Sequence, residues 1–272
     1  MRPLVETGTI FRELHAGPGA FIIPNPYDPG SARLLAHLGF KALATTSAGF
    51  AFTVGQQDNT IGRDWMLSHA ASLVVATPLP VSADLENGFG DSPEDVAETI
   101  RLAAATGLAG GSIEDSTGRP DEPVYELSHA VDRIKAAVEA AQAHPTPFVL
   151  TARAENFIVG RPDLADTIRR LQAYQEAGAE VLYAPGLKTK EEIAEVVHSV
   201  DRPVNVLRGI AGITLNLEEL SELGVRRVSV GSALSRAALG EFLRAAREMA
   251  EHGTFGFNDR TVSFSELQQM FG

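Results

Sequence analysis

Acidic side chains gather where two short apolar segments of the chain end. Asp84 and Glu86 follow the segment 79–83, and Glu114 and Asp115 follow the segment 110–113. If both segments are neighbouring parallel strands, their carboxyl ends meet on one rim and bring the four carboxylates together. Residues two apart in a strand point the same way, so Asp84 and Glu86 can both turn inward. Carboxylates this close repel one another unless protons or a cation intervene.

A hard divalent cation is the partner that such a set of oxygen atoms favours. Mg²⁺ binds one or two protein carboxylates and keeps several waters. Asp84, Glu86 and Glu114 are therefore the predicted metal ligands, with Mn²⁺ as the alternative ion. The competing interpretation is that these acids cap the following helices or form ion pairs on a solvated rim.

A basic residue, Arg153, lies directly at a strand end on the same rim, after the apolar segment 147–152. A guanidinium beside a metal site can hold a carboxylate or phosphate through two parallel hydrogen bonds. The alternative is a structural salt bridge from Arg153 to Glu114 or Glu155. We predict that Arg153 binds the substrate.

Small and polar residues at two further apolar segments complete the predicted rim. Ser47, Ala48 and Gly49 follow the segment 42–46, and their small side chains would let backbone N–H groups approach an anionic substrate. Asn205 lies within the segment 203–207 and is a further candidate for substrate binding.

Other chemistries are disfavoured by what is missing from the strand ends. The seven histidines fall in helical or loop patterns, so a histidine metal cluster or a histidine-based triad is not expected. The few lysines also avoid the strand ends, which disfavours a Schiff base. The chain has no cysteine, which excludes disulfides, thiolate metal sites and a thiol nucleophile.

The elements that must position these residues alternate along the chain. Amphipathic helical patterns separate eight strand-length apolar segments, and the clearest helices cover 92–105, 127–143, 162–177 and 232–250. This alternation over residues 1–272 predicts one (β/α)₈ TIM barrel domain. The main alternative is a doubly wound open sheet, but the first strand–helix turn, 25–31, lacks a dinucleotide-binding glycine pattern. The eight segments are 20–24, 42–46, 79–83, 110–113, 147–152, 180–184, 203–207 and 227–230.

Charge and hydropathy limit the class of partner. The formal net charge is -12, so nucleic acid is not an expected partner. No segment approaches the roughly 18–20 apolar residues that span a bilayer, and the start of the chain lacks the apolar region of a signal peptide. We expect a cytoplasmic protein with no membrane partner.

Several motifs together resemble the isocitrate lyase/phosphoenolpyruvate mutase superfamily, and the resemblance runs from about Phe21 to Phe255. The motifs after the third and fourth apolar segments are the most specific pair. In chain order the motifs are Asn25-Pro26-Tyr27-Asp28, Ser47-Ala48-Gly49, Gly55-Gln56-Gln57-Asp58, Val81 to Gly90, Ile113-Glu114-Asp115-Ser116 and Thr151-Ala152-Arg153.

The resemblance implies a barrel whose eighth helix is swapped between the subunits of a dimer or tetramer, which assigns residues 232–272 to oligomerisation. It implies Mg²⁺ held by Asp84, with Glu86 and Glu114 acting largely through bound water. It also implies that a small 2-oxo acid binds on the metal, on the backbone amides around Ser47 and on Arg153. Asp58 matches a family aspartate near the reacting centre.

One departure from the superfamily bears on the reaction. The best-known lyases carry Lys, Cys and His in the loop after the fourth strand, whereas residues 116–123 have none of these. Arg119 in this loop is the candidate to replace the missing lysine. The chain therefore resembles the oxaloacetate decarboxylase-like or 2-oxo-acid-binding branch.

The leading hypothesis is a Mg²⁺-dependent lyase that decarboxylates or cleaves a C–C bond of an oxaloacetate-like 2-oxo acid through a metal-stabilised enolate. The alternatives are a mutase or hydrolase acting on the P–C bond of phosphonopyruvate, or a protein that binds 2-oxo acids without turnover.

Overall fold

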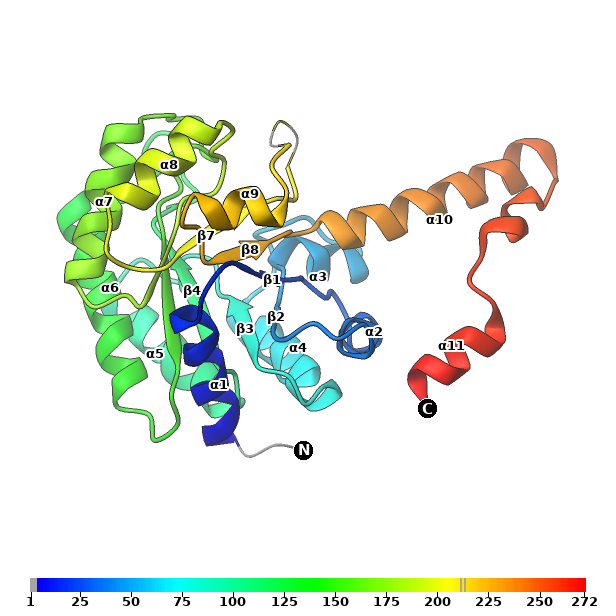
Figure 1. Cartoon of the computed structure of the whole chain (residues 1–272), viewed down its shortest axis with the longest axis horizontal. Coiled ribbons are helices and arrows are strands. Elements are labelled where there is room, and N and C mark those ends of the chain that lie inside the picture. Colours follow the sequence, from blue (N-terminus) through cyan, green and yellow to red (C-terminus); the bar gives the residue numbers. More distant parts are fainter. Residues whose placement is uncertain (1–3, 211, 213) are drawn as a thin grey trace.

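The computed structural model describes residues 4–210, 212 and 214–272, and its centre is a parallel sheet (Figure 1). The strands follow one another in the order β1-β8-β7-β6-β5-β4-β3-β2. At the remaining seam, the Ala44 N–H donates to the Pro24 carbonyl over 3.1 Å. The predicted (β/α)₈ barrel is therefore confirmed, as a nearly closed barrel. Its strands are β1 (Phe21–Ile23), β2 (Leu43–Ala44), β3 (Val81–Asp84), β4 (Gly110–Glu114), β5 (Val149–Arg153), β6 (Val181–Tyr183), β7 (Val204–Leu207) and β8 (Arg227–Ser229).

Helices alternate with these strands, and the chain adds a short helix after β2. The helices are α1 (Leu4–Ala16), α2 (Pro29–His37), α3 (Ser47–Thr53), α4 (Arg63–Ala76), α5 (Pro93–Ala105), α6 (Leu127–Gln142), α7 (Leu164–Glu176), α8 (Lys190–His198), α9 (Leu217–Glu222), α10 (Ala233–His252), the 3₁₀ helix η1 (Gly256–Arg260) and α11 (Phe264–Phe271).

Local signals in the sequence explain where several helices begin and end. Ser92 caps α5, since its hydroxyl accepts from the Asp95 N–H while the Asp95 side chain accepts from the Ser92 N–H. After α5 and α7, Gly107 and Gly178 adopt left-handed φ angles of 91° and 105°. Glycine takes this conformation without a steric penalty and turns the chain back toward the next strand.

The amino-terminal end of the barrel is closed by α1. Phe11 of α1 is fully buried in a cluster with Ile23, Val149 and Val181, which come from three different strands. This apolar layer fills one end of the barrel. The carboxyl end, where active sites of such barrels lie, remains accessible.

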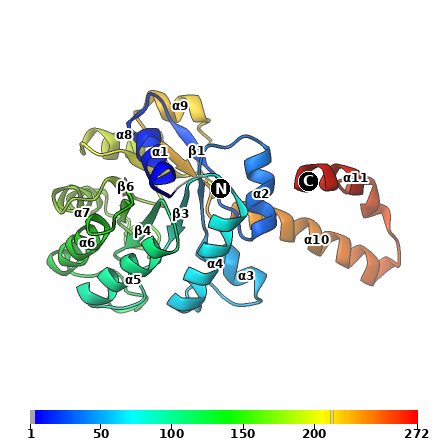
Figure 2. The same ribbon diagram turned by 90° about the horizontal axis from the view of Figure 1, so that it is seen from below.

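The C-terminal helix does not cover the barrel along most of its length. Both views show α10 projecting from the barrel, with α11 folding back toward α2 (Figures 1 and 2). Ser235 is the buried residue of α10, whereas the Phe242 side chain on the predicted apolar stripe is 67% exposed. The Arg33 guanidinium on α2 lies 5.7 Å from the ring centroid of Phe271 on α11.

Candidate active site

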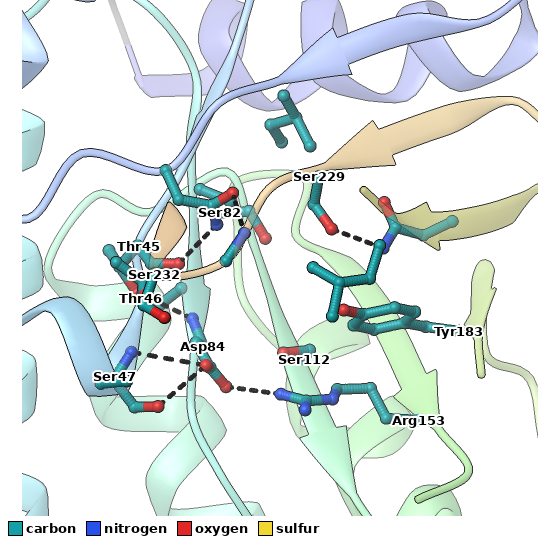
Figure 3. Close-up of a pocket in the computed structure, with 18 of the residues that line it drawn as sticks. Thr45, Thr46, Ser47, Ser82, Asp84, Ser112, Arg153, Tyr183, Ser229 and Ser232 are labelled. Atoms are coloured by element: carbon teal, nitrogen blue, oxygen red, sulfur yellow. Dashed lines mark hydrogen bonds and ion pairs between the residues drawn. The ribbon is translucent and has the colours of Figure 1, made fainter. Parts of the chain in front are cut away.

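A cavity of about 290 Å³ opens at the carboxyl ends of the strands (Figure 3). The lining includes six of the residues predicted from the sequence: Ser47, Ala48, Asp58, Asp84, Arg153 and Asn205. Strands on opposite sides of the barrel supply Asp84 and Asn205, so only closure of the barrel brings them to one cavity.

Asp84 at the end of β3 is the centre of the hydrogen-bond network on the rim. Its Oδ1 accepts from Nη1 of Arg153 over 2.8 Å, and its Oδ2 accepts from the Ser47 hydroxyl over 3.1 Å (Figure 3). The Thr45 hydroxyl accepts from the Asp84 N–H over 2.9 Å and thereby fixes the backbone at this point. Arg153 of β5 and Ser47 of α3 therefore hold this carboxylate at the mouth of the barrel.

Arg153 is surrounded by carboxylates. Besides Asp84, its guanidinium contacts Glu114 Oε2 at 3.2 Å and Glu155 Oε1 at 2.9 Å. The guanidinium carbon lies 5.1 Å from the ring centroid of Tyr183, in the geometry of a cation–π contact. The salt bridges considered from the sequence are thus present, and Arg153 also lines the cavity.

The pKa values of Glu114, Glu155 and Arg153 in this cluster are raised. Burial raises the pKa of Glu114 well above its usual value and that of Glu155 to about 7, although Arg153 acts in the opposite direction on both. The surrounding acids raise the pKa of Arg153 although burial lowers it. A cation bound at the rim would oppose these shifts, because it favours the charged form of the carboxyl groups.

Glu86 is strained and lacks a hydrogen-bond partner at one oxygen. Its backbone adopts a left-handed φ of 49°, which is costly for a residue with a side chain and is typical of functional sites. Its Oε1 is buried and accepts no hydrogen bond from the described part of the chain. Burial first, and then the charges of Asp84 and Asp58, raise the pKa of Glu86 to about 8.

These acids would suit a divalent cation such as Mg²⁺ that takes one carboxylate as a direct ligand and the others through water. Within the described residues, no group of three His, Asp or Glu side chains converges closely enough to chelate an ion by itself. Mg²⁺ retains several waters and needs only one or two carboxylates. Of Asp84, Glu86 and Glu114, Asp84 lines the cavity. The Oε1 of Glu86 accepts no hydrogen bond from the described residues, which suits it to accept from a metal-bound water.

Asp115 does not join the rim, so the expected convergence of four acids is wrong for this residue. Its carboxylate points into the helical layer, where it accepts from Tyr174 over 2.5 Å and from Arg170 over 3.1 Å. It also accepts from the Glu155 N–H over 2.8 Å. Side chains alternate along a strand, and Asp115 follows Glu114 directly, so the two must point in opposite directions.

The segment Ser47–Gly49 is the first turn of α3. Ser47 and Ala48 line the cavity, but the Gly49 N–H donates to the Thr46 hydroxyl that caps the helix, over 3.2 Å. A Cβ at Gly49 would lie 2.4 Å from Cγ2 of Thr46. Gly49 thus lets the turn approach Thr46 closely.

Asp58 and Arg119 occupy different positions relative to the cavity. Asp58 lies at its exposed mouth; partial desolvation and the charge of Asp84 raise its pKa, whereas the Ser47 hydroxyl opposes this shift. Arg119 pairs with Asp91 at 2.8 Å and does not line the cavity.

The interior of the strands supplies cavity residues that the strand-end search missed. The sequence pointed to Arg153 as the one cation of the rim, but Arg227 at the beginning of β8 also lines the cavity. Residues two apart in a strand point to the same face, so polar pairs at this spacing could have revealed a polar interior of the barrel. The pairs are Ser82/Asp84, Ser112/Glu114, Thr151/Arg153 and Arg227/Ser229.

The family model of phosphoenolpyruvate phosphomutase matches residues 11–250 of the chain. The chain belongs to this family. An oxaloacetate decarboxylase of Pseudomonas entomophila is 28% identical over 95% of the chain and 90% of the relative. The 2-methylisocitrate lyase of Escherichia coli is 30% identical over 92% of the chain and 83% of the relative.

A solved structure resembles the chain more closely than either of these enzymes. The crystal structure of a candidate lyase/mutase from Burkholderia cenocepacia is 60% identical, with a TM-score of 0.97, and the match covers 99% of this chain and 96% of that one. The family resemblance expected from the motifs is confirmed, and the named relatives are lyases and mutases. No helix in the described part of the chain is long and apolar enough to cross a membrane.

Proposed function

We propose that the protein is a divalent-metal-dependent lyase that decarboxylates or cleaves a C–C bond of a small, oxaloacetate-like 2-oxo acid. The observation that carries the proposal is the set of rim carboxylates around Asp84, with Arg153 in the same cavity. Relatives named for oxaloacetate and 2-methylisocitrate support this substrate class.

A cation bound by the rim carboxylates would suit the enolate that such a cleavage leaves behind. A Mg²⁺ or Mn²⁺ ion held by Asp84, with Glu86 and Glu114 orienting its waters, would supply positive charge that stabilises the enolate oxygen. Arg153 would hold the substrate's carboxylate, and the Ala48 N–H would donate to the same end, while the Ser47 N–H donates to Asp84 Oδ2 over 3.4 Å.

Proton transfer to the enolate carbon requires an acid at the cavity mouth. Asp58 lies there, and its raised pKa lets it hold a proton nearer to neutral pH than an ordinary aspartate does. We assign Asp58 the proton transfer. Arg119 pairs with Asp91 away from the cavity and would act there only after the loop 116–123 moves.

The test is a screen of oxaloacetate, 2-methylisocitrate and phosphonopyruvate with Mg²⁺ and with Mn²⁺, read by release of pyruvate and, for phosphonopyruvate, also by formation of phosphoenolpyruvate. We expect turnover of oxaloacetate or of 2-methylisocitrate. EDTA and Asp84→Ala should each abolish this turnover. Asp132→Ala is the matched control, because Asp132 is exposed on α6 and pairs only with Lys135 in the described structure. Equal rates in wild type and Asp84→Ala would refute the proposal.

The family's name favours a second candidate, cleavage or rearrangement of the P–C bond of phosphonopyruvate. Turnover of phosphonopyruvate alone would establish that function instead. Metal-dependent binding without any product would indicate a 2-oxo-acid-binding protein.

We also infer that the C-terminal segment 232–272 packs on a second copy of the chain. Leu239, Phe242 and Leu243 of α10 are exposed in the single chain, and so is Phe264 of α11. Burial of such a row of side chains against a partner subunit would remove it from water.

A further inference from the structure

Below the rim, the interior of the barrel is polar. The interiors of (β/α)₈ barrels are usually filled by bulky branched residues. Here Ser82, Ser112, Asn205 and Ser229 point inward and line the same cavity as Asp84 (Figure 3). Because serine is small, the cavity extends from the rim into the barrel.

Arg227 lies in this polar interior and is only 5% exposed. Its Nε donates to Asn205 Oδ1 over 2.9 Å, and its Nη2 donates to the Thr151 hydroxyl over 3.1 Å. Its Nη1 lies 3.4 Å from His15 Nε2. These three partners fix the guanidinium but leave part of its capacity of five N–H donors unused.

None of these partners carries a compensating negative charge. His15 Nδ1 lies 2.8 Å from the Phe11 carbonyl, so it carries the ring proton and Nε2 is the acceptor. Burial first, and then the charge of Arg227, lower the pKa of His15 to about 3, which keeps it neutral. Asn205 in turn donates from Nδ2 to the Ser229 hydroxyl over 2.9 Å, which directs its Oδ1 at Arg227.

The two arginines of the cavity therefore differ in charge compensation. Arg153 contacts three carboxylates, whereas Arg227 forms no ion pair with any residue in the described ranges. A buried cation without a counter-ion is costly, and an anion that enters the cavity would remove that cost.

We propose that Arg227 makes the interior of the cavity a subsite for the second carboxylate of a dicarboxylic substrate. The proposal rests on the proposed function for the other end of the substrate, which binds at the rim. Arg227 would then select dicarboxylic over monocarboxylic 2-oxo acids, because only the former bring a negative charge to the unpaired guanidinium.

Malate and 2-hydroxybutyrate test this selection. They are stable and share the 2-oxygen end, and they differ only in a carboxylate or a methyl group at C4. We expect calorimetry with Mg²⁺ to show that wild type binds malate at least about tenfold more tightly, the range of a charge-assisted hydrogen bond. Arg227→Gln should abolish this preference, and Arg227→Lys should retain part of it.

Asn205→Asp provides a second variant that keeps Arg227 and the packing around it. The new carboxylate would neutralise Arg227 internally, so it should also weaken malate more than 2-hydroxybutyrate. Oxalate, which lacks a distal carboxylate, is the control ligand, and its affinity should change less than that of malate in every variant. A purely structural role of Arg227 would lower the affinity for all three ligands together.

The outcomes separate this proposal from the proposed function. If wild type does not prefer malate, or if Arg227→Gln and Asn205→Asp leave the preference unchanged, the subsite is refuted even where oxalate binds with Mg²⁺. If the malate preference depends on Arg227 but no 2-oxo acid is turned over, the subsite stands and the proposed reaction falls.

Discussion

Arg153 contacts acids from three positions of the rim, and this fixes the plane of its guanidinium. Arg153→Lys replaces a planar fork with a point charge that cannot form two parallel hydrogen bonds to a carboxylate. We expect the variant to bind oxalate, in the presence of Mg²⁺, about tenfold or more weakly by calorimetry.

A control for this substitution lies on the opposite face of the barrel. Arg12 on α1 pairs with Glu180 at 2.7 Å outside the cavity. Arg12→Lys should leave oxalate affinity unchanged. Equal oxalate affinity in Arg153→Lys and wild type would show that Arg153 serves only the salt bridges.

The residues of the rim were predictable because active-site residues of such barrels lie at the carboxyl ends of the strands. Asp84, Glu86, Glu114 and Arg153 stand out directly after apolar segments. Arg227 was not predicted, because it begins its strand and looks like a solvated strand terminus. Only the closed barrel shows that its side chain runs inside.

At the scale of elements, α3 and α4 are joined by stacked rings beside the cavity. The rings of Phe50 and His69 are parallel, with centroids 3.8 Å apart. Burial lowers the pKa of His69 to about 4, with Asp28 opposing the shift. Protonation of His69 is therefore unfavourable in the folded state.

This shift predicts a pH dependence of stability in the acidic range. The unfolded chain protonates His69 below a pKa of about 6.5, whereas the folded chain does so only near 4. Stability is therefore lost as pH falls from about 6.5 to 4, with a slope of at most about 1.4 kcal/mol per pH unit from this group.

His69→Phe keeps a ring at this position and removes the titration. Urea unfolding at several pH values should show a shallower decline in this variant between pH 6.5 and 4. Parallel curves for wild type and His69→Phe would contradict a buried neutral His69.

The first turn of α3 gives a second prediction at this scale. The Cβ of Gly49→Ala would clash with Thr46, so the variant should lose about 1–3 kcal/mol of the free energy of unfolding. Gly62→Ala is the control, since a Cβ there meets no atom within 4 Å. Equal urea midpoints for the two variants would rule out the tight turn.

Element boundaries were predicted well where capping signals are strong and less well after β2. Ser92 and the glycines after the helices mark their elements in the sequence. The segment at Ser47 reads as a turn of small residues but forms α3, because the Thr46 hydroxyl caps it and the barrel buries Phe50.

At the scale of the whole molecule, the C-terminal segment 232–272 leaves large apolar side chains such as Phe242 and Phe264 exposed in the single chain. Truncation before Ser232 should give a monomeric or insoluble protein, because the proposed contact between copies is lost. Light scattering measures the state of the full-length and truncated chains. The same oligomer in both, or a monomeric full-length chain, would refute the assignment of residues 232–272.

The barrel was predictable from the alternation of strands and helices, but the position of the last helix was not. The pattern of 232–250 shows an apolar stripe without indicating which chain it packs on. A helix that packs on its own barrel and one that packs on a partner need the same spacing of apolar residues.

The central claim is that Asp84 holds a divalent cation through which a 2-oxo acid binds. Calorimetry of oxalate, whose adjacent carboxylates imitate the carboxylate and 2-oxygen of such an acid, tests it with Mg²⁺ and with EDTA in wild type, Asp84→Asn and the control Asp132→Asn. Oxalate should bind to wild type and to Asp132→Asn only with Mg²⁺, and Asp84→Asn should lose this binding while it keeps the fold. Oxalate binding that is equal in EDTA, or that persists in Asp84→Asn, would contradict it.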